Sequence, residues 1–149
     1  MFARAKSISH GLDNLRYITG ESSNKKKPEK ISHVCDHLFE NLDAEGMWRS
    51  MQLDLHQYRS WKGVKNGVIR IEISPLMENT VGYTRQDWID LLNDFIREFD
   101  DIQLFDEQGK LYSDRTNLAG SKYTVWLHEE SKSGIPHLHA DVCRVDHEG

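Results

Sequence analysis

The sequence lacks any long apolar run, and this excludes a membrane-spanning helix. No stretch approaches the roughly 18 consecutive apolar residues that such a helix requires. The opening residues, MFARAKSISHGL, also lack the apolar core of a secretory signal peptide. Internal repeats and low-complexity segments are absent as well. We therefore expect a protein without a membrane segment that works in the cytoplasm.

Cysteine is scarce in this chain. The two cysteines, Cys35 and Cys143, lie far apart and form no C-x-x-C pair. Such isolated residues are more typical of small buried side chains in a reducing compartment than of a disulfide. This pattern agrees with a cytoplasmic location.

An excess of positive charge is also missing, because the formal net charge is −5. A protein that coats DNA without regard to sequence is basic, so this class is excluded. A protein that grips a short single strand in one local groove stays open. The one basic run contains Lys25, Lys26 and Lys27. It is interpreted either as a solvated loop or as a phosphate contact.

The 149 residues suffice for one domain with its own core. Residues 67–74 alternate between isoleucine and polar side chains, which predicts a strand with one polar face. Residues 83–101 carry an apolar stripe at helical spacing behind a Thr84–Asp87 capping box, which predicts a helix. Three further strands are predicted, at 2–9, 122–130 and 137–145. A helix is predicted at 11–20, ending at Gly20, and one or two helices are predicted within 31–59, broken near Gly46. A hairpin is predicted within 102–114, turning at Gln108-Gly109.

This order of elements predicts an α+β fold. We expect a central antiparallel sheet with helices on one face and an open, polar active-site face on the other. One domain spans residues 1–149. Because the chain stops directly after its last strand-like run, we expect it to be the N-terminal fragment of a longer protein.

The segment SGIPHLHADV places His137 and His139 two residues apart, so both point to one face of a strand. His128 ends the preceding strand, and a turn at Ser133-Gly134 makes the two strands an antiparallel hairpin. If His128 shares the same face, three neutral imidazoles converge and can hold a catalytic metal ion. The alternative is a cluster of solvent-exposed histidines. Three imidazoles intrinsically suit zinc, nickel or copper.

The segment HEESKSGIPHLHADVCRVD resembles the histidine motif of plasmid mobilisation relaxases, which belong to the HUH endonuclease superfamily. It differs in having Glu130 where the family usually has aspartate, and in a spacer about two residues longer. The N-terminal segment SHGLDNLRYITG resembles the part of the family that carries the nucleophile, which places Tyr17 in that role. The alternative for Tyr17 is a half-buried aromatic side chain of the helix.

The resemblance implies an HUH-like fold and a DNA relaxase activity. Such an enzyme nicks and rejoins one DNA strand at a transfer origin through a 5′-phosphotyrosine intermediate, and so initiates conjugative mobilisation. The implied cofactor is Mg²⁺ or Mn²⁺, with Zn²⁺ or Ni²⁺ also able to bind in vitro. The implied partners are single-stranded DNA and, in a bacterial cytoplasm, accessory DNA-binding and coupling proteins.

Three further residues are candidates on the predicted polar face. Glu72 is expected to orient a ligand histidine by accepting its second ring N–H, or else to be an exposed carboxylate. Arg70 is positioned to meet a phosphate. Trp126 is interpreted either as a platform on which a DNA base stacks or as a core residue.

Other functions stay open at this stage. A replication initiator or transposase of the same superfamily usually carries its tyrosine after the histidine pair, whereas Tyr17 precedes it. A metal-dependent DNA-binding module would not cleave. An unrelated three-histidine hydrolase would use an activated water and would form no covalent adduct.

Overall fold

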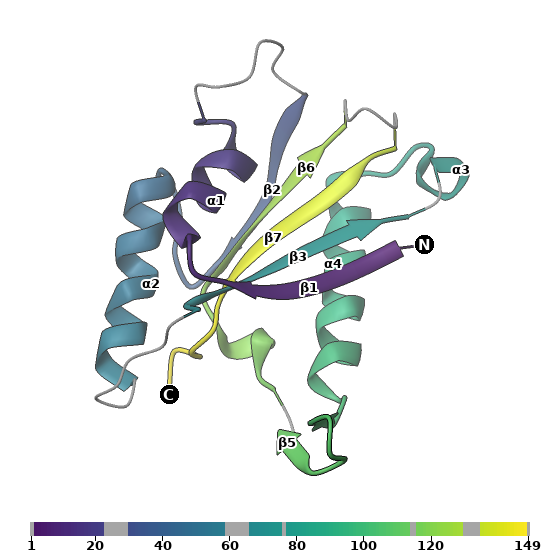
Figure 1. The fold of residues 1–149 in the computed structure, drawn as a ribbon. Helices are drawn as coiled ribbons and strands as arrows, with labels where there is room; N and C mark the ends of the chain where they lie inside the picture. Colours follow the sequence, from purple (N-terminus) through teal and green to yellow (C-terminus); the bar gives the residue numbers. More distant parts are fainter. Residues whose placement is uncertain are drawn as a thin grey trace.

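A five-stranded antiparallel sheet forms the centre of the molecule. The computed structural model describes residues 2–22, 30–58, 66–75, 77–113, 116–129 and 135–148, and Figure 1 shows the sheet running through them. In spatial order its strands are β1 (Phe2–Ile8), β3 (Val68–Ser74), β7 (His137–Cys143), β6 (Tyr123–His128) and β2 (Ile31–His37). The predicted α+β class with a central antiparallel sheet is therefore confirmed.

Helix α4 (Arg85–Asp100) covers one face of the sheet. The predicted capping box is present: the Thr84 hydroxyl accepts from the Asp87 backbone N–H, and the Asp87 carboxylate accepts from the Thr84 N–H. The apolar stripe of α4 packs against alternate residues of four strands. The fully buried members of this core include Leu92, Ile71, Val125, Ala140 and Val142.

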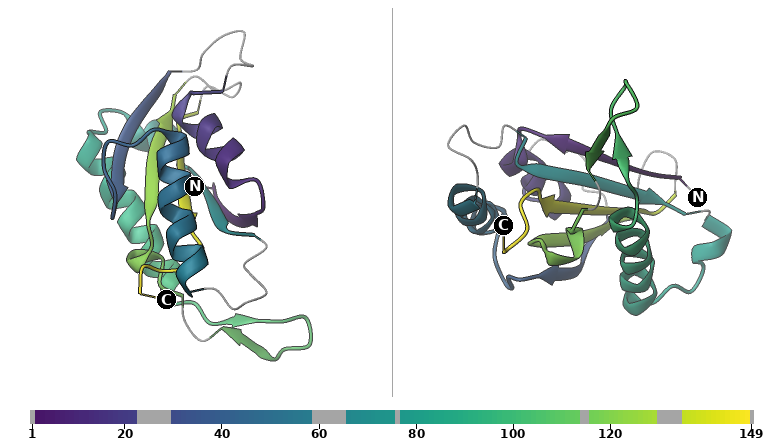
Figure 2. Two further views of the ribbon diagram at one scale, coloured as in Figure 1. Left: turned by 90° about the vertical axis from the view of Figure 1, so that its left-hand side faces the viewer. Right: turned by 90° about the horizontal axis from the view of Figure 1, so that it is seen from below.

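The other face is only partly open, which corrects the expectation of helices on one face alone. Helices α1 (Gly11–Thr19) and α2 (Ala44–Tyr58) lie on the side of the sheet opposite α4 (Figure 2). They bury a second core in which Leu15, Met47 and Met51 meet Val68 and Cys143 of the sheet. The apolar stripes of α1 and α2 need burial, and this half of the sheet supplies the surface.

Residues 31–37 form strand β2, so the helix predicted at the start of 31–59 is wrong there. The spacing of Ile31, Val34 and Leu38 imitates a helical period. In the structure the pairing of β2 with β6 shifts register between His33 and Cys35, and this irregularity breaks the two-residue alternation. The helix begins only at Ala44 and runs through Gly46 without a break.

The smaller elements lie at the edges of the fold. The predicted hairpin is present as β4 (Leu104–Phe105) and β5 (Leu111–Ser113), with Gly109 in the left-handed region between them. The chain also forms a short helix, α3 (Met77–Thr80), and a 3₁₀ turn, η1 (Leu118–Gly120), which the sequence did not predict. Across the described ranges, every helix is too short or too polar to cross a membrane.

Both cysteines are free thiols. Cys143 is buried and Cys35 is half-buried, which agrees with the prediction of packed side chains instead of a disulfide. Burial raises the pKa of each thiol to about 11. At neutral pH both sulfurs are therefore protonated and poorly nucleophilic.

The start of α1 is fixed by a close approach to the rest of the second core. A Cβ atom added at Gly11 would lie 2.4 Å from Cζ3 of Trp48 and 2.8 Å from Cγ2 of Val68. Both neighbours are held in the core, so only glycine fits at this position. Further along the chain, the Glu21 carboxylate accepts from the Thr19 hydroxyl and from the Ala44 backbone N–H, both at 2.8 Å, and so links the end of α1 to the start of α2.

We predict that Gly11→Ala lowers the free energy of unfolding by about 1–3 kcal/mol, the usual range for overpacking a core. In an exposed helix the same change would be stabilising, because alanine is the better helix former. Urea denaturation followed by circular dichroism measures the difference. A Gly11→Ala protein as stable as the wild type, or more stable, would contradict this account of how α1 is seated.

Candidate active site

The structure brings the three predicted histidines together on one sheet face. His128 and His137 are directly paired across β6 and β7, and His139 lies two residues further along β7. Residues that face each other across a strand pair share a face, as do residues two apart on one strand. The ring centroids of His128 and His139 lie 4.2 Å apart, and those of His137 and His139 lie 6.3 Å apart.

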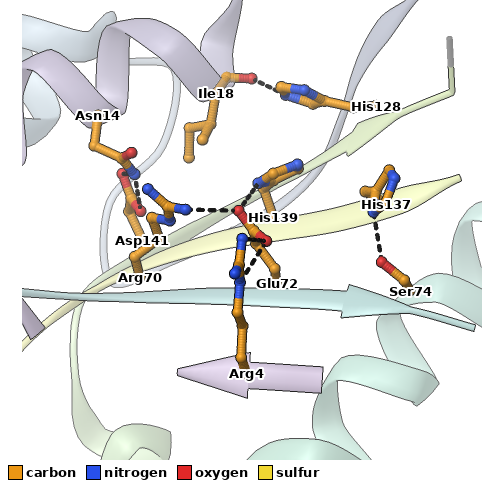
Figure 3. Close-up of polar contacts among 10 residues, drawn as sticks. All are labelled: Arg4, Asn14, Ile18, Arg70, Glu72, Ser74, His128, His137, His139 and Asp141. Atoms are coloured by element: carbon orange, nitrogen blue, oxygen red, sulfur yellow. Dashed lines mark hydrogen bonds and ion pairs between the residues drawn. The ribbon is translucent and has the colours of Figure 1, made fainter. Parts of the chain in front are cut away.

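A polar group lies next to each imidazole (Figure 3), within hydrogen-bond distance for His128 and His137. The His128 Nε2 lies 2.9 Å from the Ile18 carbonyl oxygen, and the His137 Nδ1 lies 2.5 Å from the Ser74 hydroxyl. The His139 Nδ1 lies 3.9 Å from Oε1 of Glu72, its direct partner across β3 and β7. Glu72, which was expected to orient one of the ligand histidines, is thus next to His139.

These histidines form a chemically suitable donor set for a divalent transition ion, since neutral imidazole is a common ligand of such ions. Because the His128 Nε2–H donates to a carbonyl, its lone pair is on Nδ1, and His128 would bind an ion through that atom or after turning away from Ile18. Over the parts of the chain that the structure describes, no three His, Cys, Asp or Glu side chains already direct donors to one point. The set therefore fits an ion in its composition, and its side chains would have to rotate before three of them could hold one.

Tyr17 lies against this cluster from helix α1. Its ring centroid is 5.6 Å from that of His128 and 6.1 Å from that of His139. The side chain is 37% exposed, so solvent and a substrate can reach it. The helix ends at Thr19, and the residue predicted as its stop, Gly20, is the C-cap in the left-handed conformation. Residues more than 100 positions apart in the sequence therefore meet at one site.

A buried pair that the sequence analysis missed ties α1 to the central strand. The Asn14 amide nitrogen lies 2.6 and 2.8 Å from the two carboxyl oxygens of Asp141. Asp141 is fully buried, and burial raises its pKa to about 7, against the opposing effects of the Asn14 hydrogen bond and the Arg70 charge. One sequence signal was available: Asp141 follows His139 by two residues, so alternation already placed both on one face.

Glu72 is held between two arginines. Its Oε1 lies 2.9 Å from Nη2 of Arg70, and its Oε2 lies 2.7 Å from Nη2 of Arg4 on the neighbouring strand β1. The side chain of Glu72 is only 14% exposed. Arg70 is thus on the histidine face, as predicted from the alternation of β3, and Arg4 is an additional cation that the sequence analysis did not select.

Of the other predicted site residues, Trp126 neighbours this cluster as the direct partner of His139 across β6 and β7, and the rest fall outside the described residues. Trp126 is half-buried and packs against the second core, with its indole N–H donating to the Thr124 hydroxyl at 2.8 Å. Of its two interpretations, this position fits the core residue better. Lys25, Lys26, Lys27, Glu130 and the Ser133-Gly134 turn fall outside the residues that the structure describes.

We predict that the stability of the metal-free protein falls as pH rises from about 4 to 7 because of Asp141. Between its ordinary pKa of 3.8 and its folded pKa of about 7, the folded state holds a proton that the unfolded state has lost. Each pH unit in this window then costs about 1.4 kcal/mol. Asp141→Asn removes the titration, so relative to the wild type the variant gains roughly 3–4 kcal/mol between pH 4 and pH 8.

Urea denaturation in EDTA at a series of pH values measures this difference. Asp94→Asn is the matched control, because Asp94 lies on the exposed side of α4 with a side chain that is 63% exposed. Parallel stability curves for the wild type and Asp141→Asn would show that Asp141 does not carry the extra proton.

Comparisons with known proteins leave the family of this chain open. No family model matches it, and no significant match was found among curated proteins or among solved structures. The resemblance to relaxases therefore depends on the quoted motifs and on the geometry described above.

Proposed function

We propose that this chain is a metal-dependent DNA relaxase domain that nicks and rejoins single-stranded DNA at a transfer origin, and so initiates conjugative mobilisation. One observation carries the proposal: Tyr17, from the first helix, packs against His128 and His139 of the last two strands. A tyrosine nucleophile and a three-histidine cluster are the two parts that this chemistry requires. If Tyr17 and the histidine cluster had purely structural roles, they would not need to lie next to each other.

Tyr17 is the nucleophile in this proposal. Its phenol oxygen forms a bond to phosphorus while the bond from phosphorus to the 3′ oxygen breaks, which leaves a 5′-phosphotyrosine and a free 3′-hydroxyl. The phenol loses a proton and the departing 3′ oxygen gains one, so the step balances. Since the phosphotyrosine keeps the phosphodiester bond energy, attack by the 3′-hydroxyl reverses the reaction and rejoins the strand.

His128, His137 and His139 would hold the divalent ion, Mg²⁺ or Mn²⁺ by the resemblance. Such an ion supplies positive charge that favours the ionised phenol and offsets the negative charge of the phosphate oxygens. Glu72, whose Oε1 lies 3.9 Å from Nδ1 of His139, would favour a proton on that nitrogen through its negative charge, which leaves the lone pair on Nε2. The Ser74 hydroxyl contacts Nδ1 of His137 and can donate to it or accept from it, so this contact orients the ring without selecting its tautomer.

The Asn14–Asp141 pair positions the nucleophile. Asn14 precedes Tyr17 by one helical turn, and the carbonyl of the next residue, Ile18, accepts from His128. Tyr17 is therefore held between two points at which α1 is fastened to the sheet. Small displacements of a reacting group cost large factors in rate, so this anchoring matters for catalysis.

We predict that Tyr17→Phe abolishes a covalent protein–DNA adduct while leaving the fold intact. The wild type is incubated with Mn²⁺ and single-stranded oligonucleotides that tile the transfer-origin region of its own genetic element, and the products are separated on a denaturing gel. The expected result is a shifted band for the wild type and none for Tyr17→Phe or His137→Ala. Tyr83→Phe is the matched control, because Tyr83 packs on Trp88 beneath the opposite face of the sheet.

Each other result identifies a different function. An adduct that survives Tyr17→Phe keeps the enzyme class and shows that another residue is the nucleophile. Cleavage without an adduct would indicate a hydrolase that uses an activated water. Binding of metal and DNA with neither cleavage nor adduct would contradict the proposed relaxase and favour a binding module.

A further inference from the structure

Three cations line the sheet beside the histidine cluster, on the part of the face that the helices leave uncovered. Arg4 and Lys6 lie on β1, where they pair across the strands with Glu72 and Arg70 of β3. Direct partners share a face, and Glu72 in turn pairs with His139. We call Arg4, Lys6 and Arg70 the β1–β3 strip. It continues the histidine face toward the edge of the sheet.

This strip is accessible. Helix α1 contacts β7, β6 and β2, and among the described elements α1 and α2 reach β1 and β3 only at the end of these strands that holds Ile8 and Val68. Lys6 is exposed, and the side chains of Arg4 and Arg70 are 57% and 32% exposed. A ligand extended from the histidine cluster can therefore contact all three cations without displacing a helix.

The strip presents positive charge to solvent. Two carboxyl groups neighbour it, but the side chain of Glu72 is only 14% exposed and Asp141 is fully buried. The chain as a whole has a formal net charge of −5. A local cationic surface on an acidic protein therefore concentrates anionic ligands at this one place.

We infer that the β1–β3 strip binds the phosphate backbone of single-stranded DNA and guides it between the histidine cluster and the β1 edge of the sheet. Neighbouring strands lie about 4.8 Å apart and residues two apart on a strand about 6.8 Å apart, so all three cations are within roughly 12 Å of His139. Contacts of this kind hold the strand in place and carry no base specificity. The inference is based on the proposed function, which it extends to the path of the substrate.

A single strand fits this surface better than a duplex or a protein. Double-stranded DNA is a stiff rod, whereas a single strand bends freely between neighbouring phosphates. A flexible strand can therefore contact the strip and still place one phosphate at the histidines. An acidic protein segment could meet the same cations, and the experiment below distinguishes it.

The experiment measures binding of fluorescein-labelled single-stranded oligo(dT) by anisotropy at a series of salt concentrations, in EDTA. Arg4→Gln/Lys6→Gln is expected to lower the slope of log affinity against log salt by about 1.4, because each phosphate contact to a single strand contributes about 0.7. Binding at 0.1 M salt is then roughly 25-fold weaker, if the affinities converge at 1 M. Lys6→Gln alone leaves the Arg4–Glu72 pair in place and is expected to lower the slope by about 0.7.

Arg97→Gln/Lys110→Gln is the matched control, with the same change in net charge. Arg97 lies on α4, on the far side of the sheet, and Lys110 lies in the hairpin between β4 and β5. The control is expected to leave the slope unchanged, and circular dichroism checks that all variants fold. An unchanged slope in both strip variants, or an equal loss in the control, would overturn the inference.

Competition with polyglutamate tests the other source of negative charge. If polyglutamate displaces oligo(dT) at an equal concentration of charges, the strip is a surface for acidic protein and the inference fails. Because this assay contains no metal, its outcome is independent of the adduct assay. If no adduct forms while the strip still binds oligo(dT), only the proposed relaxase activity is contradicted. If the adduct forms and neither its yield nor its salt dependence changes in the strip variants, only the inference about the strip is contradicted.

Discussion

The hydrogen-bonded pair of Asn14 and Asp141 is the interaction on which the proposed site depends. It joins the first helix to the central strand at a point from which water is excluded, and Asp141 is costly to bury unless both of its oxygens are satisfied. That requirement fixes the rotation of α1 on the sheet. One turn further along the helix, the same rotation directs Tyr17 toward His128 and His139. A buried polar contact thus determines where a half-exposed aromatic side chain lies.

The division of the sheet face explains how a polar site and an apolar core share one surface. On β7, His139 and Asp141 lie between the cations of β3 and the apolar contacts of α1 and α2. Polar groups along this boundary find partners on both sides, so none of the named side chains is left in a purely apolar surrounding. The boundary is also where a substrate on the open side can reach a side chain held by the covered side. Tyr17 occupies that position.

Local sequence patterns predicted the elements in which the spacing of apolar residues stays the same along the whole element. Strand β3 and helix α4 were predicted because each buries one continuous stripe, and the pairing of β6 with β7 followed from the short connection between them. Strand β2 was missed because its irregular register changes the period within seven residues. The Asn14–Asp141 contact could not be predicted, since its partners are separated by 127 positions and only the tertiary structure joins them. The histidines and Tyr17 were selected by motif, and their meeting in space is a property of the fold.

The charge distribution adds a constraint on any nucleic acid that reaches this site. With a net charge of −5, most of the surface repels a polyanion. This repulsion lowers non-specific binding more than it lowers binding at one cationic surface. The same arrangement limits the number of phosphate contacts, so affinity from the backbone alone is modest at physiological salt. Recognition of one DNA site must then draw on contacts to bases as well as to phosphates. Under the proposed function, this acidic domain with its short cationic strip would hold DNA firmly only where sequence contacts and the strip act together, which would suit an enzyme that cuts at one place and releases the strand after rejoining it.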